Sequence, residues 1–217
     1  MLIDIYDDRY QWTGRADKRD AHRRGLWHRV FTCLVVHPER RTVTLQAKQP
    51  GLYGFDRPDF LDVSVGGHYE AGENIADGVR EIREELGLEV EFSTLVPIGV
   101  RQTAATLAPD YIANEFQHIF LLPTSAALAR SARENAEVRG LVELPLDETL
   151  ALLLGKADQA FAVAWSETMA SAAAAGPIRV TRDAFPPSYL AVDQLFPRLF
   201  VAAHRYLRGD DPELIFW

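Results

Sequence analysis

Three glutamates, Glu81, Glu84 and Glu85, occupy positions i, i+3 and i+4 of a short charged segment. On a helix this spacing brings the three side chains onto one face. Because like charges repel one another, such a face is best explained by a cation bound between the carboxylates. Carboxylate oxygens, together with a backbone carbonyl such as that of Gly67, suit Mg²⁺ or Mn²⁺ rather than a soft metal ion. The segment therefore predicts a site for a hard divalent cation.

A solvated helix face is the alternative interpretation, since charge runs are common on exposed helices. Two neighbouring features favour the metal site. Gly67 and the glycine before it directly follow a strand-like run at 60–65, and Glu73 lies where it can pair with Arg80 and hold the loop against the helix. A magnesium site beside a glycine loop typically handles phosphates.

The opposite face of the same segment predicts how it is positioned. Ile75, Val79, Ile82 and Leu86 recur at spacings of 4, 3 and 4 residues, which makes an apolar stripe that can seat a helix on a core. Gly87 follows where a left-handed C-terminal cap is expected. We therefore expect a helix that is buried on one side and presents its carboxylates beside the glycine loop.

The elements around this helix predict an α/β fold. Apolar, β-branched runs at 30–36 and 42–47 flank a turn, and further strands are expected at 60–65, 95–102, 116–122 and 138–144, with a helix at 146–154. Two loops, 50–58 and 103–114, separate these elements. The pattern favours an α/β/α sandwich around a mixed sheet.

The character of the chain changes near residue 156. An alanine-rich helix is expected at 157–175, a short strand at 178–181 and a further helix at 188–207. We therefore divide the chain into a domain at 1–155 and a helical extension at 156–217 that packs on the core and is not an independent domain. A dimerisation element, giving a homodimer, and a substrate lid are the alternatives for this extension.

Composition limits the classes of function. The net charge of −8 argues against a nucleic-acid polymer as partner, whereas a phosphate substrate is compatible with it because a bound cation inverts the local field. The single cysteine, Cys33, lies in an apolar run and allows no intramolecular disulfide. No signal-peptide layout and no apolar run long enough for a membrane are seen. We expect a cytoplasmic enzyme with a small-molecule substrate and no membrane partner.

A local excess of basic residues precedes the first long strand. In an otherwise acidic chain it could supply a positive wall for phosphates, and a solvated N-terminal segment is the alternative. The residues are Arg9, Arg15, Lys18, Arg19, Arg23, Arg24 and Arg29.

The strand, the glycine loop and the charged helix together resemble the Nudix box, whose pattern is Gly-x₅-Glu-x₇-Arg-Glu-U-x-Glu-Glu-x-Gly-U with U aliphatic. Gly67 to Glu73 fits, and so does every fixed position from Arg80 to Leu88. One departure is that six residues, not seven, separate Glu73 from Arg80. The departure leaves the helical glutamates in phase with one another and puts the Glu73–Arg80 pairing in question.

Segments outside the box are similar to those of isopentenyl-diphosphate isomerase, and the likeness covers roughly residues 20–150. That enzyme relies on a catalytic cysteine just before the histidine that corresponds to His68, and here the position is Gly66. The resemblance implies a second metal site formed by His22, His28, His68 and Glu115, although His22 and His28 are one residue closer than in the isomerase. Structural roles for these histidines are the alternative.

The resemblance implies a hydrolase in which a divalent cation bridges the box carboxylates and a diphosphate. Gly67, Glu81, Glu84 and Glu85 would hold the metal ion, and Glu85 is the strongest candidate. Arg80 would pair with Glu73, and a box glutamate or Glu115 would act as general base. Mg²⁺, or Mn²⁺, is the implied cofactor.

Three hypotheses follow. The first is a Mg²⁺-dependent hydrolase of a diphosphate linked to an organic group, such as a nucleoside diphosphate derivative. The second is an isoprenoid-diphosphate isomerase, against which Gly66 counts. The third is a non-catalytic diphosphate sensor, against which the intact run from Arg80 to Leu88 counts. The organic group would be chosen by residues of the loops 50–58 and 103–114 and by the C-terminal helices.

Overall fold

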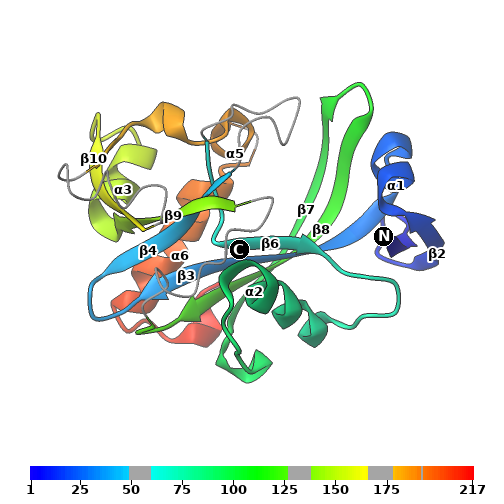
Figure 1. Ribbon diagram of the computed structural model, residues 1–217, viewed down its shortest axis with the longest axis horizontal. Coiled ribbons are helices and arrows are strands. Elements are labelled where there is room, and N and C mark those ends of the chain that lie inside the picture. Colours follow the sequence, from blue (N-terminus) through cyan, green and yellow to red (C-terminus); the bar gives the residue numbers. More distant parts are fainter. Residues whose placement is uncertain (49–59, 127–137, 166–177, 192) are drawn as a thin grey trace.

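A computed structural model describes residues 1–48, 60–126, 138–165, 178–191 and 193–217 of the chain (Figure 1). Its strands are β1 (Leu2–Tyr6), β2 (Trp12–Asp17), β3 (Trp27–His37), β4 (Thr42–Lys48), β5 (Leu61–Asp62), β6 (Val65–His68), β7 (Val96–Ala108), β8 (Tyr111–Pro123), β9 (Val138–Pro145), β10 (Ala160–Trp165) and β11 (Ile178–Val180). Its α-helices are α1 (Lys18–Arg24), α2 (Val79–Leu86), α3 (Leu146–Leu153), α5 (Pro187–Ala191) and α6 (Leu195–Leu207), and its short 3₁₀ helices are η1 (Ile75–Gly78), η2 (Phe92–Thr94), η4 (Arg182–Ala184) and η5 (Pro212–Leu214).

The described strands form one mixed sheet with β3 at its centre. Strand β3 runs parallel to β8, with His28 opposite Glu115 and Val36 opposite Pro123, and antiparallel to β1, β4 and β6. The longest path through the sheet is β11-β10-β9-β4-β3-β1-β2. The expected mixed α/β architecture is therefore confirmed.

Both faces of the central strand are buried, which explains why apolar residues predominate from Val30 to Val36. Phe31, Cys33 and Val35 point to one face, where they pack with Ile82 and Leu86 of α2. Leu34 and Val36 point to the other face and belong to the core formed with α3 and α6. Helices thus cover the two faces of the sheet, as Figure 1 shows.

Helix α2 begins and ends at sequence signals. The turn η1 precedes it, and Asn74 and Asp77 form a reciprocal capping box there. Gly87 ends the helix with φ 68°, the left-handed conformation expected of a C-terminal cap. Ile82 and Leu86 are fully buried, whereas Ile75 lies in η1 and is 37% exposed, so the apolar stripe begins later than the spacing predicts.

Two strand predictions need correction. The expected loop at 103–114 is wrong, because β7 and β8 continue as a long hairpin that pairs Thr103 with Glu115 and Ala108 with Tyr111. The small residues of this stretch carry little strand signal, and only Pro109-Asp110 marks the turn. The expected strand at 60–65 is two short strands, β5 on β4 and β6 on β3. The loop at 50–58 lies outside the described residues.

The C-terminal region combines strands and helices. The predicted helix at 157–175 is wrong at Ala160–Trp165, which form β10 against β9, and residues 166–177 lie outside the described residues. The strand expected near 178 is β11, and the helix expected at 188–207 is divided into α5 and α6. Strand pairing overrides the helix propensity of alanine here because β9 offers an unpaired edge. Within the described ranges, no helix has the length and apolarity needed to cross a membrane.

Candidate active site

A cavity of about 440 Å³ lies where the glycine-containing strand β6 meets α2, the β7–β8 hairpin and α5. Gly67, Glu81, Glu84 and Glu85 all line it, and so do Arg80, His68 and Glu115. The structure therefore brings the predicted carboxylates and part of the predicted histidine group into one space.

Arg80 organises the carboxylates on α2. Its Nε and Nη2 atoms donate to the two oxygens of Glu73 at 2.9 and 3.2 Å, Nη2 also donates to Glu81 at 3.0 Å, and Nη1 donates to Glu84 at 2.9 Å. The hydrogen bonds to Glu73 raise the pKa of Arg80, so its positive charge is secure. The Glu73–Arg80 pair thus forms despite the shortened spacer, because η1 replaces the first turn of the helix.

Gly67 makes room for Glu81. A Cβ atom at position 67 would lie 2.1 Å from the Cδ atom of Glu81, a distance that no side chain tolerates. Strand β6 pairs Gly67 with Phe31, on the face of the sheet that α2 covers. The missing side chain therefore lets the carboxylate of Glu81 lie against β6, where it lines the cavity, and this is the close approach that glycine permits.

Glu85 is the most buried of the three helical glutamates, with 5% of its surface exposed. Its Oε2 atom accepts hydrogen bonds from Gln46 Nε2 at 2.6 Å and from the Gly66 amide at 3.1 Å. In the described part of the chain both donors bind Oε2, so Oε1 is the oxygen available to a metal ion or water. Burial raises the pKa of Glu85 to about 7, and the positive charge of Lys48 opposes that rise.

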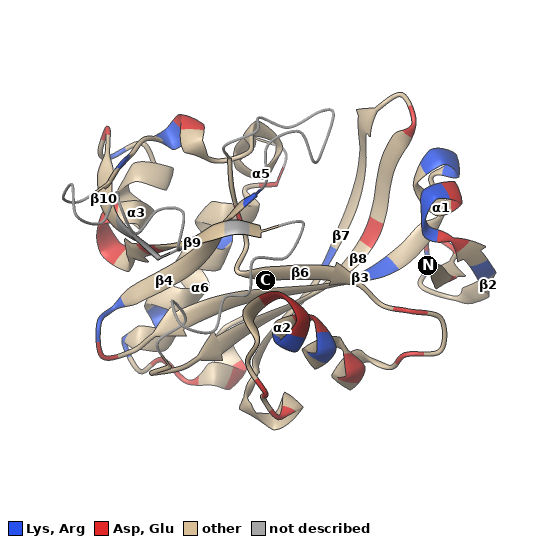
Figure 2. Cartoon of the chain, in the orientation of Figure 1, with Lys and Arg blue, Asp and Glu red and all other residues tan. Residues whose placement is uncertain are grey.

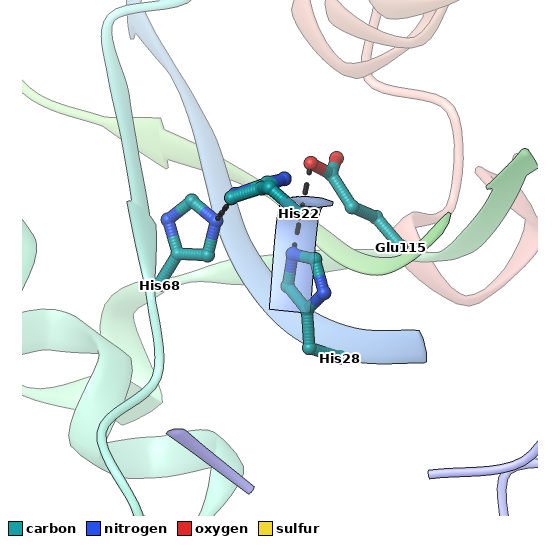
Figure 3. A group of neighbouring side chains, drawn as sticks. All are labelled: His22, His28, His68 and Glu115. Atoms are coloured by element: carbon teal, nitrogen blue, oxygen red, sulfur yellow. Dashed lines mark hydrogen bonds and ion pairs between the residues drawn. The ribbon is translucent and has the colours of Figure 1, made fainter. Parts of the chain in front are cut away.

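A second group of potential metal ligands lies together beside the cavity, and His68 and Glu115 of this group line it (Figure 3). His22, His28, His68 and Glu115 each offer one ligand atom, and these atoms lie within 4.8 Å of one another. His22 Nε2 is 3.0 Å from His68 Nε2, and His28 Nε2 is 3.9 Å from the nearer oxygen of Glu115. The parallel register of β3 and β8 places His28 opposite Glu115, so the sheet itself builds this group.

The protonation of these histidines suits a metal ion. The Nδ1 atoms of His22 and His28 donate to the backbone carbonyls of Ile112 and Leu26, at 3.2 and 2.8 Å, which leaves each Nε2 atom with its lone pair. His28 Nε2 is buried and has no hydrogen-bond partner among the described residues. Burial lowers the pKa of both His22 and His28 to about 4, so both are neutral at pH 7. Three imidazoles and a carboxylate fit a transition-metal ion such as Mn²⁺ better than Mg²⁺.

The basic residues of the N-terminal region do not gather as a wall. Figure 2 shows several of them on α1 and the strands beside it, and only Lys18 among them lines the cavity. Arg15 pairs with Asp4, and Arg23 pairs with Asp20. Arg29 lies between the rings of Tyr6 and Tyr69. Because it lines the cavity, Lys18 is the member of the set that can meet a substrate there.

Several lining residues have no counterpart in the sequence motifs. Lys48 is 3% exposed, and its charge lowers the pKa values of Asp62 and Glu85, although burial keeps both above their usual range. A signal for Lys48 exists in β4, where the polar residues Thr44, Gln46 and Lys48 alternate with apolar ones and all are buried. Arg101, Gln117 and the lining residues from α5 carry no such signal.

Comparisons with known proteins agree with this geometry. The model of the NUDIX domain family matches residues 26–165. A protein of Clostridium acetobutylicum named as a Nudix hydrolase is 34% identical over 161 residues, which cover 74% of this chain and 78% of that protein. Another from Nostoc is 28% identical over 56% of this chain and 79% of its own length. A crystal structure from Deinococcus radiodurans shares the fold, with a TM-score of 0.50 and 24% identity over 71% of this chain and 90% of that one.

Proposed function

This chain belongs to the Nudix family of hydrolases, and we propose that it is a divalent-metal-dependent enzyme that cleaves a diphosphate linked to an organic group. The single observation that carries the proposal is the position of Glu85. Two donors fix one of its carboxylate oxygens, and the cavity that it lines also contains Glu81, Glu84 and the cationic Lys48.

The residues present fit a hard cation. Glu85, Glu81 and Glu84, with the carbonyl of Gly67, would hold Mg²⁺ or Mn²⁺, and the space at Gly67 that only a glycine leaves is what admits Glu81. When bound, the ion neutralises charge on the diphosphate and makes a bound water a better nucleophile. Arg80 anchors Glu81 and Glu84 and keeps them in place as the substrate enters.

The remaining chemistry falls to the protein. The water oxygen forms a bond to one phosphorus, the bond from that phosphorus to the bridging oxygen breaks, and the bridging oxygen leaves on the second phosphate. The base that takes the proton of the water would be one of the box glutamates or Glu115, because these carboxylates line the cavity. Lys18 and Lys48 also line it and would balance the phosphate charge.

We further propose that His22, His28, His68 and Glu115 hold a second metal ion. The support is the convergence of their ligand atoms and the unpartnered, buried Nε2 atom of His28. Calorimetric titration with Mn²⁺ tests this proposal. We expect two binding events in the wild-type protein and one in the His28→Gln variant, and an unchanged titration in that variant would contradict it.

The test of the hydrolase is phosphate release from a panel of nucleoside and non-nucleoside diphosphates with Mg²⁺ and with Mn²⁺. Glu85→Gln removes the central ligand, so turnover should fall by about two orders of magnitude or more. Glu89→Gln, an exposed glutamate just beyond the helix, is the matched control and should retain wild-type turnover. A Glu85→Gln variant within about threefold of the wild-type rate would rule out the metal role.

The isomerase alternative is favoured by one observation, the histidine group that the resemblance implies. The site has no thiol for that reaction, because Gly66 occupies the position expected for the cysteine and Cys33 is buried on the α2 face of the sheet. Burial also raises the pKa of the Cys33 thiol, which makes it a poor acid or base. Exchange of solvent deuterium into isopentenyl diphosphate would support the isomerase.

A non-catalytic sensor would bind diphosphates tightly under saturating Mg²⁺ without cleaving them, so the same panel, measured for both binding and release, separates it from the hydrolase. A cytoplasmic location, a small-molecule partner and the absence of nucleic-acid and membrane partners stay predictions from the sequence. So do the domain boundary near residue 155 and the homodimer alternative.

A further inference from the structure

The lining of the cavity differs from one end to the other. Carboxylates and the cations Arg80 and Lys48 surround the end beside α2. The apolar end, at the β7–β8 hairpin and residues 186–195, adds small and apolar groups beside polar side chains such as those of Arg101, Thr103 and Gln117. The small and apolar groups are Ala105, Leu107, Ala113, Pro186, Tyr189 and Leu195. A diphosphate and the group attached to it therefore meet chemically different surfaces.

Part of the apolar end comes from the C-terminal region rather than from the family's matched residues. Pro186, Ser188, Tyr189 and Leu195 line the cavity and lie beyond residue 165, where the family match ends. Leu195 is 1% exposed and belongs to the core with Phe196, whose ring centre lies 5.5 Å from that of Tyr189. The core thus holds this C-terminal wall, which we define as Pro186, Ser188, Tyr189 and Leu195.

One ion pair joins the wall to the rest of the site. Arg101 on β7 is 4% exposed, and its guanidinium binds both carboxylate oxygens of Asp193, with Nη2 at 3.1 Å from Oδ1. The same guanidinium lies 5.8 Å from the ring centre of Tyr189. Because a buried arginine needs its partner, the pair ties Asp193, which lies between Tyr189 and Leu195 in the chain, to β7.

The contacts of Arg101 extend to the histidine group. Arg101 Nη1 donates to Gln117 Oε1 at 2.7 Å, and Gln117 Nε2 donates to Glu115 Oε2 at 2.7 Å. Arg101 therefore positions the wall and, through Gln117, the carboxylate that faces His28. Its charge is committed to Asp193, so at this end of the cavity it is not available to a charged substrate group.

We propose that the C-terminal wall determines substrate specificity, that it contacts the organic group attached to the diphosphate, and that this group is uncharged and largely apolar. The Arg101–Asp193 pair is the positioning element of the wall. This inference rests on the proposed function, since it assigns the second half of the same substrate. It goes beyond that function because it assigns specificity to residues 186–195, which lie outside the region that matches the family.

Binding of two non-hydrolysable probes tests the wall. Methyl and benzyl methylenediphosphonate share the ionic half and differ only in the organic group, and their affinities are measured by calorimetry with Mg²⁺. We expect the wild-type protein to bind the benzyl compound at least about tenfold more tightly, because its ring is removed from water against the wall. In Tyr189→Ala this preference should fall to about twofold or less, with the affinity for the methyl compound unchanged.

Tyr206→Ala is the matched control. Tyr206 packs against the same core as Tyr189 and is absent from the described lining of the cavity, so the benzyl preference should persist in this variant.

The Asp193→Asn variant tests the Arg101–Asp193 pair. It should lower the benzyl preference, and it should raise KM for benzyl diphosphate more than it lowers kcat. If Tyr189→Ala does not fold, Ser188→Phe is the second variant. Ser188 is half-buried, so the larger side chain should narrow the cavity beside the wall and lower affinity for the benzyl probe alone.

The outcomes separate this inference from the proposed function. The proposal that the wall determines specificity would be overturned if the wild-type protein bound the two probes equally well. It would also be overturned if the benzyl preference survived both Tyr189→Ala and Ser188→Phe. A clear benzyl preference without hydrolysis of any diphosphate would support the specificity role of the wall and contradict the proposed hydrolase function. Hydrolysis with tighter binding of nucleoside than of benzyl probes would contradict the apolar class of substrate.

Discussion

The carboxylate of Glu81 fills the space that a side chain at position 67 would occupy. Strand β6 and helix α2 therefore approach closely at this point because position 67 has no side chain. The relationship links the glycine of the box directly to the position of one of its glutamates.

Gly67→Ala should consequently displace Glu81 and lower the rate of diphosphate cleavage by about two orders of magnitude, the scale of losing a group that stabilises the transition state. Gly66→Ala is the graded control, because its added Cβ would lie 3.3 Å from a methyl group of Val63 and 4.0 Å from the carbonyl oxygen of Phe31. Rates are compared after circular dichroism has shown that both variants are folded. Equal losses in the two variants would contradict the steric explanation.

The buried carboxyl of Glu85 makes the stability of the metal-free protein depend on pH. Burial raises its pKa from 4.5 to about 7, so its contribution to stability is present below pH 4.5 and is lost as pH rises through 7. Glu85→Gln removes the buried charge and should raise the free energy of unfolding at pH 8 by about 2 kcal/mol. At pH 5 the difference should be much smaller. Urea unfolding in EDTA measures both values, and destabilisation of the variant at pH 8 would count against the raised pKa.

The two proposed metal sites should respond differently to acid. Protons compete with the metal ion at Glu85 below its pKa of about 7, whereas His22 and His28 stay neutral until about pH 4. Between pH 7 and pH 5.5 we expect Mn²⁺ affinity to fall by about tenfold or more at the carboxylates and to change little at the histidines. Titration of His28→Gln isolates the first site, and titration of Glu85→Gln isolates the second. A steeper loss at the histidines would reverse the assignment.

Asp4 ties the N-terminal strands to the glycine loop. It accepts hydrogen bonds from the Gly72 amide at 2.7 Å, and from Trp12 Nε1 and Arg15 Nε at 3.1 Å each. Burial raises its pKa, but these bonds outweigh burial and the net shift is downward. Asp4→Ala should cost about 2 kcal/mol of unfolding free energy at pH 7, because three donors lose their acceptor. The exposed Asp8→Ala is the control for urea unfolding, and equal stabilities would refute the role of Asp4.

Local signals in the sequence were sufficient for the helix that carries the glutamates. The spacing of Val79, Ile82 and Leu86, and the cap at Gly87, predict α2 and the phase of its carboxylates because both depend on residues within a few turns. The apolar run at 30–36 likewise predicts a strand, and the structure shows that this strand is buried on both faces. The motif then identifies the family from positions that lie close together in the chain.

Only the tertiary structure decided the rest of the site. The convergence of His28, Glu115 and His68 follows from the pairing of β3 with β8 and β6, which no spacing in the sequence specifies. The strand at Ala160–Trp165 forms because β9 accepts it, against the local preference of its alanines. The wall at Tyr189 exists because Arg101, 92 residues from Asp193 in the chain, finds its ion-pair partner there. Local propensity fixes a helix and its phase, whereas a cavity is fixed by which distant surfaces the folded chain brings together.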